Sequence, residues 1–297
     1  MKKWINIILI GTFIFAIFTG CSSREEKKII LAGKAYTEAQ LTAEIMAQLI
    51  EAQTDIKVER KYDMSGSICF AAIKSGEIDM YPEYTGGMVM AYLNQDIEPG
   101  TSPEETYKRA KEGFANEHNL IVLESMGFNN TYANAIKTEY AEEHNIKTNS
   151  DLAAFTPELT YGAEHLFYDR LDGYHNMCDV YDFQFSDYFM IDVSLKQQSI
   201  KQGAFDVTNV YTTDGWLDGS GLTILEDDLN FFPAYYCCPV IRKETLEKYP
   251  EIESALSPLK NCSTEEDMIY YNNLVDTKGM SIANAAKQFI EDKELLK

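Results

Sequence analysis

Two tyrosines stand at the ends of two copies of one sequence pattern. The first copy, IKSGEIDMYPEYT, runs from Ile73 to Thr85, and the second, IKQGAFDVTNVYT, runs from Ile200 to Thr212. Tyr84 and Tyr211 each lie 11 positions after the first Ile of their copy (84−73 and 211−200). Aromatic ring faces attract cations that cannot donate hydrogen bonds. A pair of such tyrosines is therefore suited to bind a quaternary ammonium group.

Each copy predicts the end of a helix, a glycine stop, a short strand and a tyrosine at the exit of that strand. Gly76 and Gly203 suit the left-handed position after a helix, and the apolar run that follows each Asp suits a buried strand of a parallel sheet. The copies lie too far apart for a solenoid repeat, so they indicate two lobes of similar build. Each lobe then presents its tyrosine at the carboxyl edge of a sheet, where open α/β sheets bind ligands. The alternative is a chance similarity between two common helix-to-strand junctions.

Motifs of catalysis are missing from the sequence. It contains no G-x-S-x-G, no H-E-x-x-H and no phosphate-binding G-x-x-x-x-G-K, and its four histidines are scattered. These observations predict a binding protein without a metal or cofactor, and not an enzyme.

Composition narrows the class of partner. The 297 residues are 45% hydrophobic, which is typical of a globular chain, and they are enough for two domains of ordinary size. The formal net charge of −21 argues against nucleic acid or an anionic membrane surface as a partner. Any anion must be bound by a few local cations.

The N-terminus predicts export. Residues 1–20 combine two lysines, an apolar run and small residues, as in a secretory signal peptide. The ending FTGC resembles a bacterial lipobox, so we expect Cys21 to be acylated and residues 21–28 to form a tether at the outer face of the cytoplasmic membrane. The alternative is an ordinary cysteine at the end of a signal peptide. The five remaining cysteines are odd in number, which argues against a complete disulfide framework.

The elements before the first repeat place one cation near the predicted site. A strand from Ile29 leads into a loop with Lys34, and a helix then follows with Thr37 as its N-cap and Gln40 three positions later, as in a capping box. Lys34 is thereby predicted at the carboxyl edge of the first sheet. Thr264 with Asp267, and Ser281, mark helix starts near the C-terminus.

Six segments in order resemble the osmoprotectant-binding proteins of ABC importers, the glycine betaine/choline/carnitine family. They are GKAYTEAQ, GEIDMYPEYTG, NNTYA, the segment from Arg170 to Tyr174, DVTNVYTTDG and DDLNFFPAYY. The resemblance implies an α/β, two-lobed type II periplasmic-binding-protein fold with two crossing hinge strands. The second lobe, 131–235, is inserted into the first, which comprises 29–130 and 236–297. In that family four tyrosines form an open box around the ammonium group, here Tyr84, Tyr132, Tyr211 and Tyr235.

The resemblance also implies where the rest of the ligand lies. Contacts to a carboxylate come from Lys34 and Arg170, and Gly87 stands where the family has a threonine. The extra space at Gly87 can admit a bulkier zwitterion such as carnitine. The expected function is a monomeric, membrane-anchored receptor that delivers glycine betaine or a similar zwitterion to an ABC permease. The alternatives are a choline- or carnitine-specific receptor, a ligand-sensing lipoprotein without transport and, from another class, a hydrolase.

Overall fold

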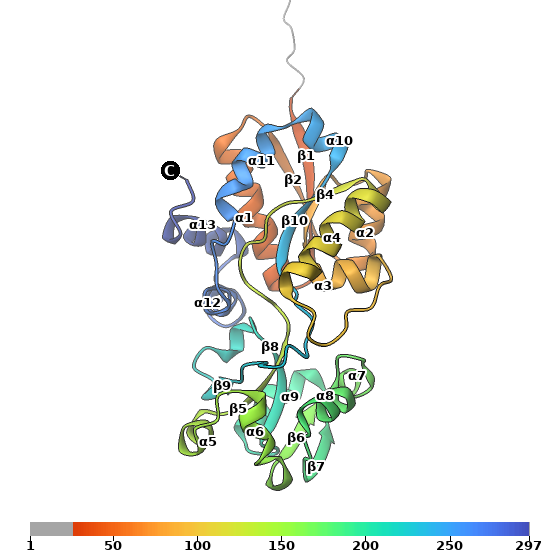
Figure 1. Cartoon of the computed structure of the whole chain (residues 1–297). Coiled ribbons are helices and arrows are strands. Elements are labelled where there is room, and N and C mark those ends of the chain that lie inside the picture. The colour runs from red at the N-terminus through yellow and green to blue at the C-terminus, as the bar shows by residue number, and fades with distance from the viewer. Residues whose placement is uncertain (1–25, 297) are drawn as a thin grey trace, which may run out of the picture.

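The computed structural model describes residues 26–296. They form two α/β lobes, each built on a five-stranded sheet and joined by two crossing segments (Figure 1). The predicted signal peptide and Cys21 lie outside the described residues. Within the described part of the chain, no helix has the length and apolar character that a membrane span requires.

The first sheet has the strand order β2-β1-β3-β10-β4. Strand β1 pairs in parallel with β2 and β3, whereas β10 runs antiparallel to β3 and β4. The prediction of a parallel sheet is therefore wrong for half of the strand contacts, because the chain re-enters this lobe from the opposite end. The strands are β1 (Lys28–Lys34), β2 (Lys57–Met64), β3 (Met80–Tyr84), β4 (Leu120–Val122) and β10 (Cys237–Arg242).

Helices cover both faces of this sheet. Helices α1, α11 and α13 bury their apolar side chains on one face, and α2 and α4 cover the other (Figure 1). The helical elements are α1 (Thr37–Gln53), α2 (Gly66–Ser75), α3 (Thr85–Gly87) with its π-helical continuation η1 (Met88–Tyr92), α4 (Pro103–His118), α10 (Lys243–Lys248), α11 (Glu251–Leu256), η4 (Ser257–Leu259), α12 (Glu265–Asp276) and α13 (Ile282–Asp292).

The second sheet has the order β7-β6-β8-β5-β9 and repeats the build of the first. Strand β6 is parallel to β7 and β8, and β5 is antiparallel to β8 and β9. The strands are β5 (Tyr132–Lys137), β6 (Thr160–Ala163), β7 (Asp187–Met190), β8 (Val207–Tyr211) and β9 (Leu222–Ile224); the helical elements are α5 (Thr138–His144), α6 (Asn149–Ala153), η2 (Thr156–Glu158), α7 (His165–Asp169), α8 (Tyr174–Tyr181), α9 (Val193–Lys201) and η3 (Gly215–Leu217).

The two sequence copies occupy the same place in the two lobes. Strands β3 and β8 are each the central strand of their sheet, and each ends at its tyrosine, Tyr84 or Tyr211. Gly76 and Gly203 have φ angles of +82° and +73°, in the left-handed region that favours glycine. The predicted sequence of glycine stop, strand and exit tyrosine is confirmed in both copies.

Two crossing segments join the lobes, residues 123–131 and 225–236. They run side by side: the Asn130 amide donates to the Tyr235 carbonyl at 3.1 Å, and Met126 donates to Cys237 at 2.9 Å. The exact lobe boundaries at residues 130/131 and 235/236 stay a prediction.

Of the helix starts predicted at Thr37, Thr264 and Ser281, two are confirmed and one is wrong. The Thr264 capping box with Asp267 and the Ser281 N-cap are confirmed. The capping box at Thr37 is wrong, because Tyr36 is the N-cap residue and makes no side-chain cap. The Thr37 hydroxyl instead donates to the Asp276 carboxylate, a partner that lies far away in the sequence. All five cysteines in the described part of the chain are free.

Candidate ligand-binding site

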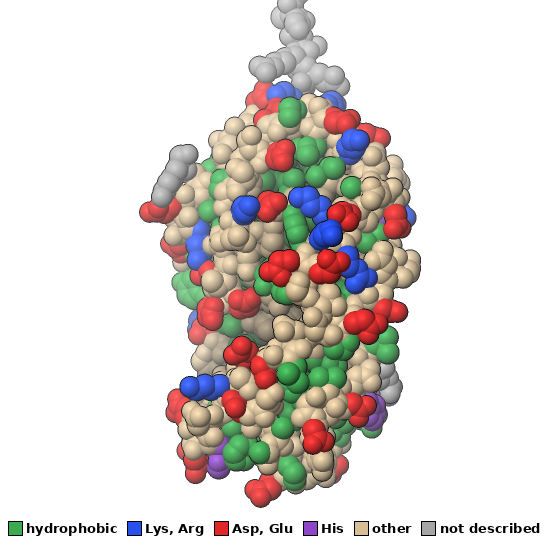
Figure 2. All heavy atoms as spheres, in the orientation of Figure 1, with side chains coloured by type: hydrophobic (Ala, Val, Ile, Leu, Met, Phe, Trp, Pro, Cys, Tyr) green, Lys and Arg blue, Asp and Glu red, His purple; other side chains and the backbone are tan. Residues whose placement is uncertain are grey.

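A cavity of about 620 Å³ lies between the two sheets. Figure 2 shows the surface hollowed between the two lobes on this face. All seven residues that the sequence proposed for the ligand line this cavity: Lys34, Tyr84, Gly87, Tyr132, Arg170, Tyr211 and Tyr235. They come from strand ends and loops of both lobes and from a crossing segment, so no single lobe holds the set.

The ends of the central strands bring tyrosines from both lobes to this cavity. Tyr84 ends β3 of the first lobe and is 5% exposed. Tyr211 ends β8 of the second lobe and is 43% exposed, and Tyr132, the first residue of β5, is its direct partner across the two strands. Strand pairing therefore sets two of these side chains against each other.

Tyr132 and Tyr211 form one stacked pair. Their ring centres are 4.7 Å apart at an angle of 25°, and their hydroxyl oxygens are 3.0 Å apart. A trimethylammonium group does not fit between two rings at this spacing. The pair therefore makes a single aromatic wall of the cavity, which Tyr84 and Tyr235 also line.

Tyr235, and not its neighbour Tyr236, lines the cavity. The Tyr235 amide donates to Asn129 Oδ1 at 2.7 Å, which fixes the crossing segment. A Cβ atom at Gly86 would come within 2.9 Å of both the Ala234 carbonyl and the Tyr235 ring. The Tyr235 ring therefore packs directly against the Gly86 backbone, and this close contact requires glycine.

The two cations of the cavity already have carboxylate partners. Lys34 makes an ion pair with the buried Glu83, and its Nζ lies 5.1 Å from the centre of the Tyr84 ring. Arg170 makes a bidentate pair with Asp172, with Nε and Nη2 at 2.6 and 2.7 Å from the carboxylate oxygens. These pairs orient both cations, and they also reduce the charge available to an anionic group.

Arg170 also lies against the aromatic wall, with its guanidinium carbon 5.4 Å from the centre of the Tyr132 ring. Two of the tyrosines that the sequence proposed for an ammonium group are thus each in contact with a cation of the protein itself. Such contacts show that these rings lie where a positive charge can reach them.

Gly87 leaves open space in the wall. Its φ is −62°, an ordinary helical value, and a Cβ at this position would meet only Glu83 Oε1 at 3.6 Å. Neither backbone strain nor close packing requires glycine here. The missing side chain therefore enlarges the cavity beside Lys34 and Glu83.

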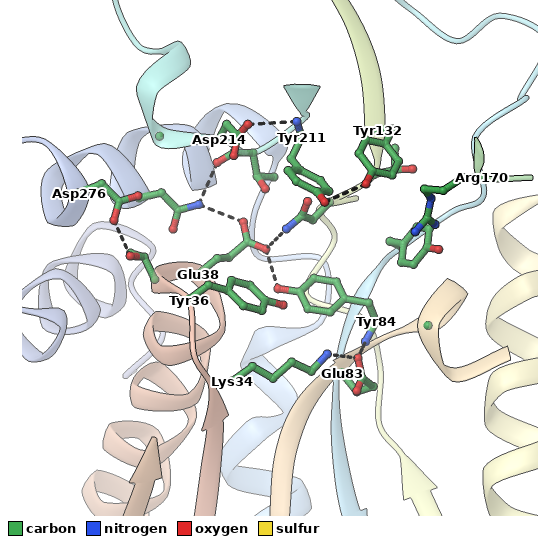
Figure 3. A pocket seen from close by; sticks show the side chains of 18 of the residues that line it. Lys34, Tyr36, Glu38, Glu83, Tyr84, Tyr132, Arg170, Tyr211, Asp214 and Asp276 are labelled. Atoms are coloured by element: carbon green, nitrogen blue, oxygen red, sulfur yellow. Dashed lines mark hydrogen bonds and ion pairs between the residues drawn. The ribbon is translucent and has the colours of Figure 1, made fainter. Parts of the chain in front are cut away.

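Sequence reasoning missed a carboxylate in the middle of the site. Glu38, in the first turn of α1, is 3% exposed and lines the cavity. Its carboxylate accepts hydrogen bonds from the Tyr84 hydroxyl at 2.6 Å, from Asn130 Nδ2 at 2.7 Å and from Asn272 Nδ2 at 3.0 Å (Figure 3). The position of Glu38, four residues after Lys34 at a helix start, was a usable signal; that of Asn272 in α12 offered none.

A second missed carboxylate lies beside the aromatic wall. Asp214 Oδ2 accepts from the Tyr211 amide and from Trp216 Nε1, both at 3.1 Å. Burial raises the pKa of Asp214 to about 6, because the two hydrogen bonds and the charge of Lys196 offset only part of the lost hydration of the ionised form. Acidic groups outnumber cations in this cavity: Glu38, Glu83, Asp214 and Asp276 face Lys34 and Arg170.

Comparison with known proteins agrees with this arrangement. Residues 27–292 match the family model described as the substrate-binding domain of ABC-type glycine betaine transport systems. A solved structure titled a glycine betaine/carnitine/choline ABC transporter has 25% identity and a TM-score of 0.84, covering 91% of this chain and all (100%) of that one.

Two relatives extend the comparison. A carnitine transport binding protein of Listeria monocytogenes is 29% identical over 98% of this chain and 96% of its own length. The ergothioneine transport permease/ergothioneine binding protein of Helicobacter pylori is 33% identical over 90% of this chain but only 48% of its own length, so the chain spans about half of that relative. The chain belongs to the family of substrate-binding domains of ABC-type glycine betaine transport systems, and it is the extracytoplasmic binding component of an importer, not an enzyme.

Proposed function

We propose that this protein captures a quaternary ammonium compound, glycine betaine or a similar zwitterion, between its lobes and delivers it to an ABC permease. The observation that carries the proposal is the meeting of tyrosines from both lobes at one cavity that also contains Lys34 and Arg170. Rings that come from different lobes contact the same head group only when the lobes close on it. Capture and closure are then one event.

The free energies of cation–π contacts indicate that the aromatic rings alone do not give micromolar binding. Each desolvated cation–π contact contributes about 2 kcal/mol, so the Tyr211 wall, Tyr84 and Tyr235 together give roughly 6 kcal/mol before any cost of closure. A micromolar complex needs about 8 kcal/mol. Contacts between the ligand's other end and Arg170 or Lys34 are therefore part of the proposal.

One observation favours a ligand larger than glycine betaine. The open space at Gly87 lies beside the Lys34–Glu83 pair, where the far end of a ligand would reach. The relatives named for carnitine and ergothioneine bind betaines that are larger than glycine betaine. The alternative ligand is thus a bulkier zwitterion of the same class, with choline as a further candidate.

A calorimetric screen of the protein without residues 1–20 tests the proposal. Glycine betaine, carnitine, choline, proline betaine and ergothioneine would be titrated in parallel. Binding of at least one of them, with affinity in the micromolar range or better, is the expected result. Failure of all five to bind would contradict the proposed function.

The N-terminal segment is the basis for our proposal of where in the cell the protein acts. Acylation of Cys21 would tether the protein as a monomer to the outer face of the cytoplasmic membrane, beside its permease. Cys21→Ala should release the protein from the membrane fraction of expressing cells, and retention of this variant would contradict the lipid anchor.

A further inference from the structure

Glu38 differs from Glu83, the other glutamate of the cavity wall, in the kind of partner it has. Glu83 forms an ion pair with the cation Lys34. The hydrogen-bond partners of Glu38 include a tyrosine hydroxyl and two asparagine amides, and none of the ion pairs in the described part of the chain includes it. Glu38 is thus a buried carboxylate without a cation of its own.

Its surroundings accommodate the ionised form. Each of the three partners supplies a donor to a carboxylate oxygen, and the group lies at the N-terminus of the 17-residue helix α1, where the helix dipole favours negative charge. Burial raises the pKa of Glu38, which is the cost of keeping a charge out of water. A cationic ligand in the same cavity offsets that cost.

The hydrogen bond to Tyr84 connects this charge to an aromatic ring of the cavity. A phenol that donates to a carboxylate makes a short, charge-assisted hydrogen bond, and the bond shifts electron density toward the ring. The face of a ring with more electron density attracts a cation more strongly. Because the Tyr84 hydroxyl is 2.6 Å from Glu38 Oε1, its ring carries part of the negative character of that carboxylate.

We propose that Glu38 is the counter-charge of the ligand's ammonium group and acts on it through the hydroxyl of Tyr84. This makes Glu38 a specificity-determining residue for cationic head groups. The inference rests on the proposed function, because it requires a ligand with a quaternary nitrogen at the Tyr84 ring.

A purely structural role for Glu38 has different consequences. Glu38 connects Asn130 of a crossing segment with Asn272, whose amide also donates to the Thr213 carbonyl of the second lobe at 2.9 Å. If Glu38 only held these segments together, its loss would weaken all ligands of one shape equally. A counter-charge affects only those that carry the positive nitrogen.

Two ligands, glycine betaine and 3,3-dimethylbutanoate, separate the two roles. They have the same shape and the same carboxylate, but glycine betaine has a positively charged nitrogen where 3,3-dimethylbutanoate has a neutral carbon. We expect Glu38→Gln to lower the affinity for glycine betaine by about tenfold and that for 3,3-dimethylbutanoate by less than about twofold. Tyr84→Phe keeps the ring and removes the hydroxyl; in this background, Glu38→Gln should change betaine affinity by less than about twofold. Equal losses for both ligands, or an undiminished loss in the Tyr84→Phe background, would overturn the proposal.

The remaining outcomes are also decisive. If 3,3-dimethylbutanoate binds too weakly to measure, the coupling between Glu38→Gln and Tyr84→Phe decides alone. If Glu38→Gln does not fold, Tyr84→Phe carries the test, and betaine affinity equal to that of the wild type overturns the proposal. A wild-type protein that binds no quaternary ammonium compound ends the proposed function as well, whereas wild-type binding with no effect of Glu38→Gln ends only this inference.

Discussion

Arg170 lies over the ring of Tyr132, with its guanidinium carbon 5.4 Å from the ring centre, while Tyr211 stacks on that ring at 4.7 Å and Phe167 contacts it at 5.1 Å. Tyr132 is thereby occupied by groups of the protein itself. Tyr211 is 43% exposed, and in the first lobe Tyr84 lines the same cavity with Lys34 Nζ 5.1 Å from its ring centre. This arrangement makes Tyr211 and Tyr84 the informative positions for mutation.

Tyr84→Ala and Tyr211→Ala should each weaken ligand binding by about thirtyfold or more, because each removes a ring face worth about 2 kcal/mol. Replacement by Phe keeps the ring and should cost less. Titration calorimetry with the best ligand of the screen measures both. Tyr270→Ala is the matched control, since Tyr270 is an exposed tyrosine of α12 that does not line the cavity. Wild-type affinity in either cavity variant would contradict the aromatic site.

Arg170→Ala should lower the affinity for a zwitterion about tenfold more than that for choline. A charge-assisted contact with a carboxylate contributes about 1.5–3 kcal/mol, and choline has no carboxylate. For the same reason the wild type should prefer glycine betaine over choline by at least about tenfold. Arg170→Lys, which keeps the charge but loses the bidentate fork, should give an intermediate result. Equal losses for both ligands would exclude a carboxylate contact at Arg170.

Gly87→Thr should shift preference from larger to smaller zwitterions. The backbone at Gly87 is helical and a Cβ fits there, so the new side chain fills space in the cavity without strain. We expect the affinity ratio of carnitine to glycine betaine to fall by about tenfold, measured by competition titration. Gly87→Ala is the control and should have a smaller effect. An unchanged ratio in Gly87→Thr would show that no ligand group reaches this space.

Ligand binding should change the emission of Trp216. This residue lies in η3, donates to Asp214, and its element packs on α12 of the other lobe, so lobe movement alters its surroundings. The other tryptophan, Trp4, belongs to the predicted signal peptide. The signal should disappear in Trp216→Phe; a signal that persists in this variant comes from tyrosines.

Asp214 should make the free protein more stable in mild acid than at neutral pH. Its pKa of about 6 in the folded state lies above the ordinary value of 3.8. Between these values the folded state binds more protons than the unfolded chain, so the contribution of Asp214 to stability falls as pH rises through this window. The full difference is at most about 3 kcal/mol.

Urea unfolding of the wild type and of Asp214→Asn between pH 4 and 7 measures this effect. Asparagine keeps a carbonyl oxygen for the Tyr211 and Trp216 donors and removes the titration. The free-energy curves of the two proteins should diverge with pH. Curves that stay parallel would contradict the buried carboxylate.

The sequence predicted those parts of the site that local rules determine. Tyr84 and Tyr211 follow from a glycine stop and a short apolar strand, because such strands end at one edge of a sheet. The family resemblance supplied Tyr132, Tyr235 and Arg170, which local rules alone do not bring to this cavity.

What the sequence did not predict depends on contacts between distant segments. The family resemblance implied that the chain returns to the first lobe, but the antiparallel direction of β10 depends on its pairing with β3, which lies before the inserted lobe in the sequence. Thr37 donates to Asp276, and Glu38 accepts from Asn272. Both of these partners lie in α12, more than 200 residues later in the sequence. No periodicity or capping rule links residues at such separations.

The two crossing segments also determine how the chain can fold. The segments that lead out of the first lobe and back into it lie side by side, with a hydrogen bond of 3.1 Å from the Asn130 amide to the Tyr235 carbonyl. Until the intervening stretch of roughly a hundred residues is compact, pairing β10 with β3 carries a loop-closure entropy that grows with the logarithm of its length. Once the inserted lobe has folded, its own ends hold β10 beside β3 and that cost is gone. The insertion thus favours an order of assembly in which the inner lobe folds before the outer sheet is completed.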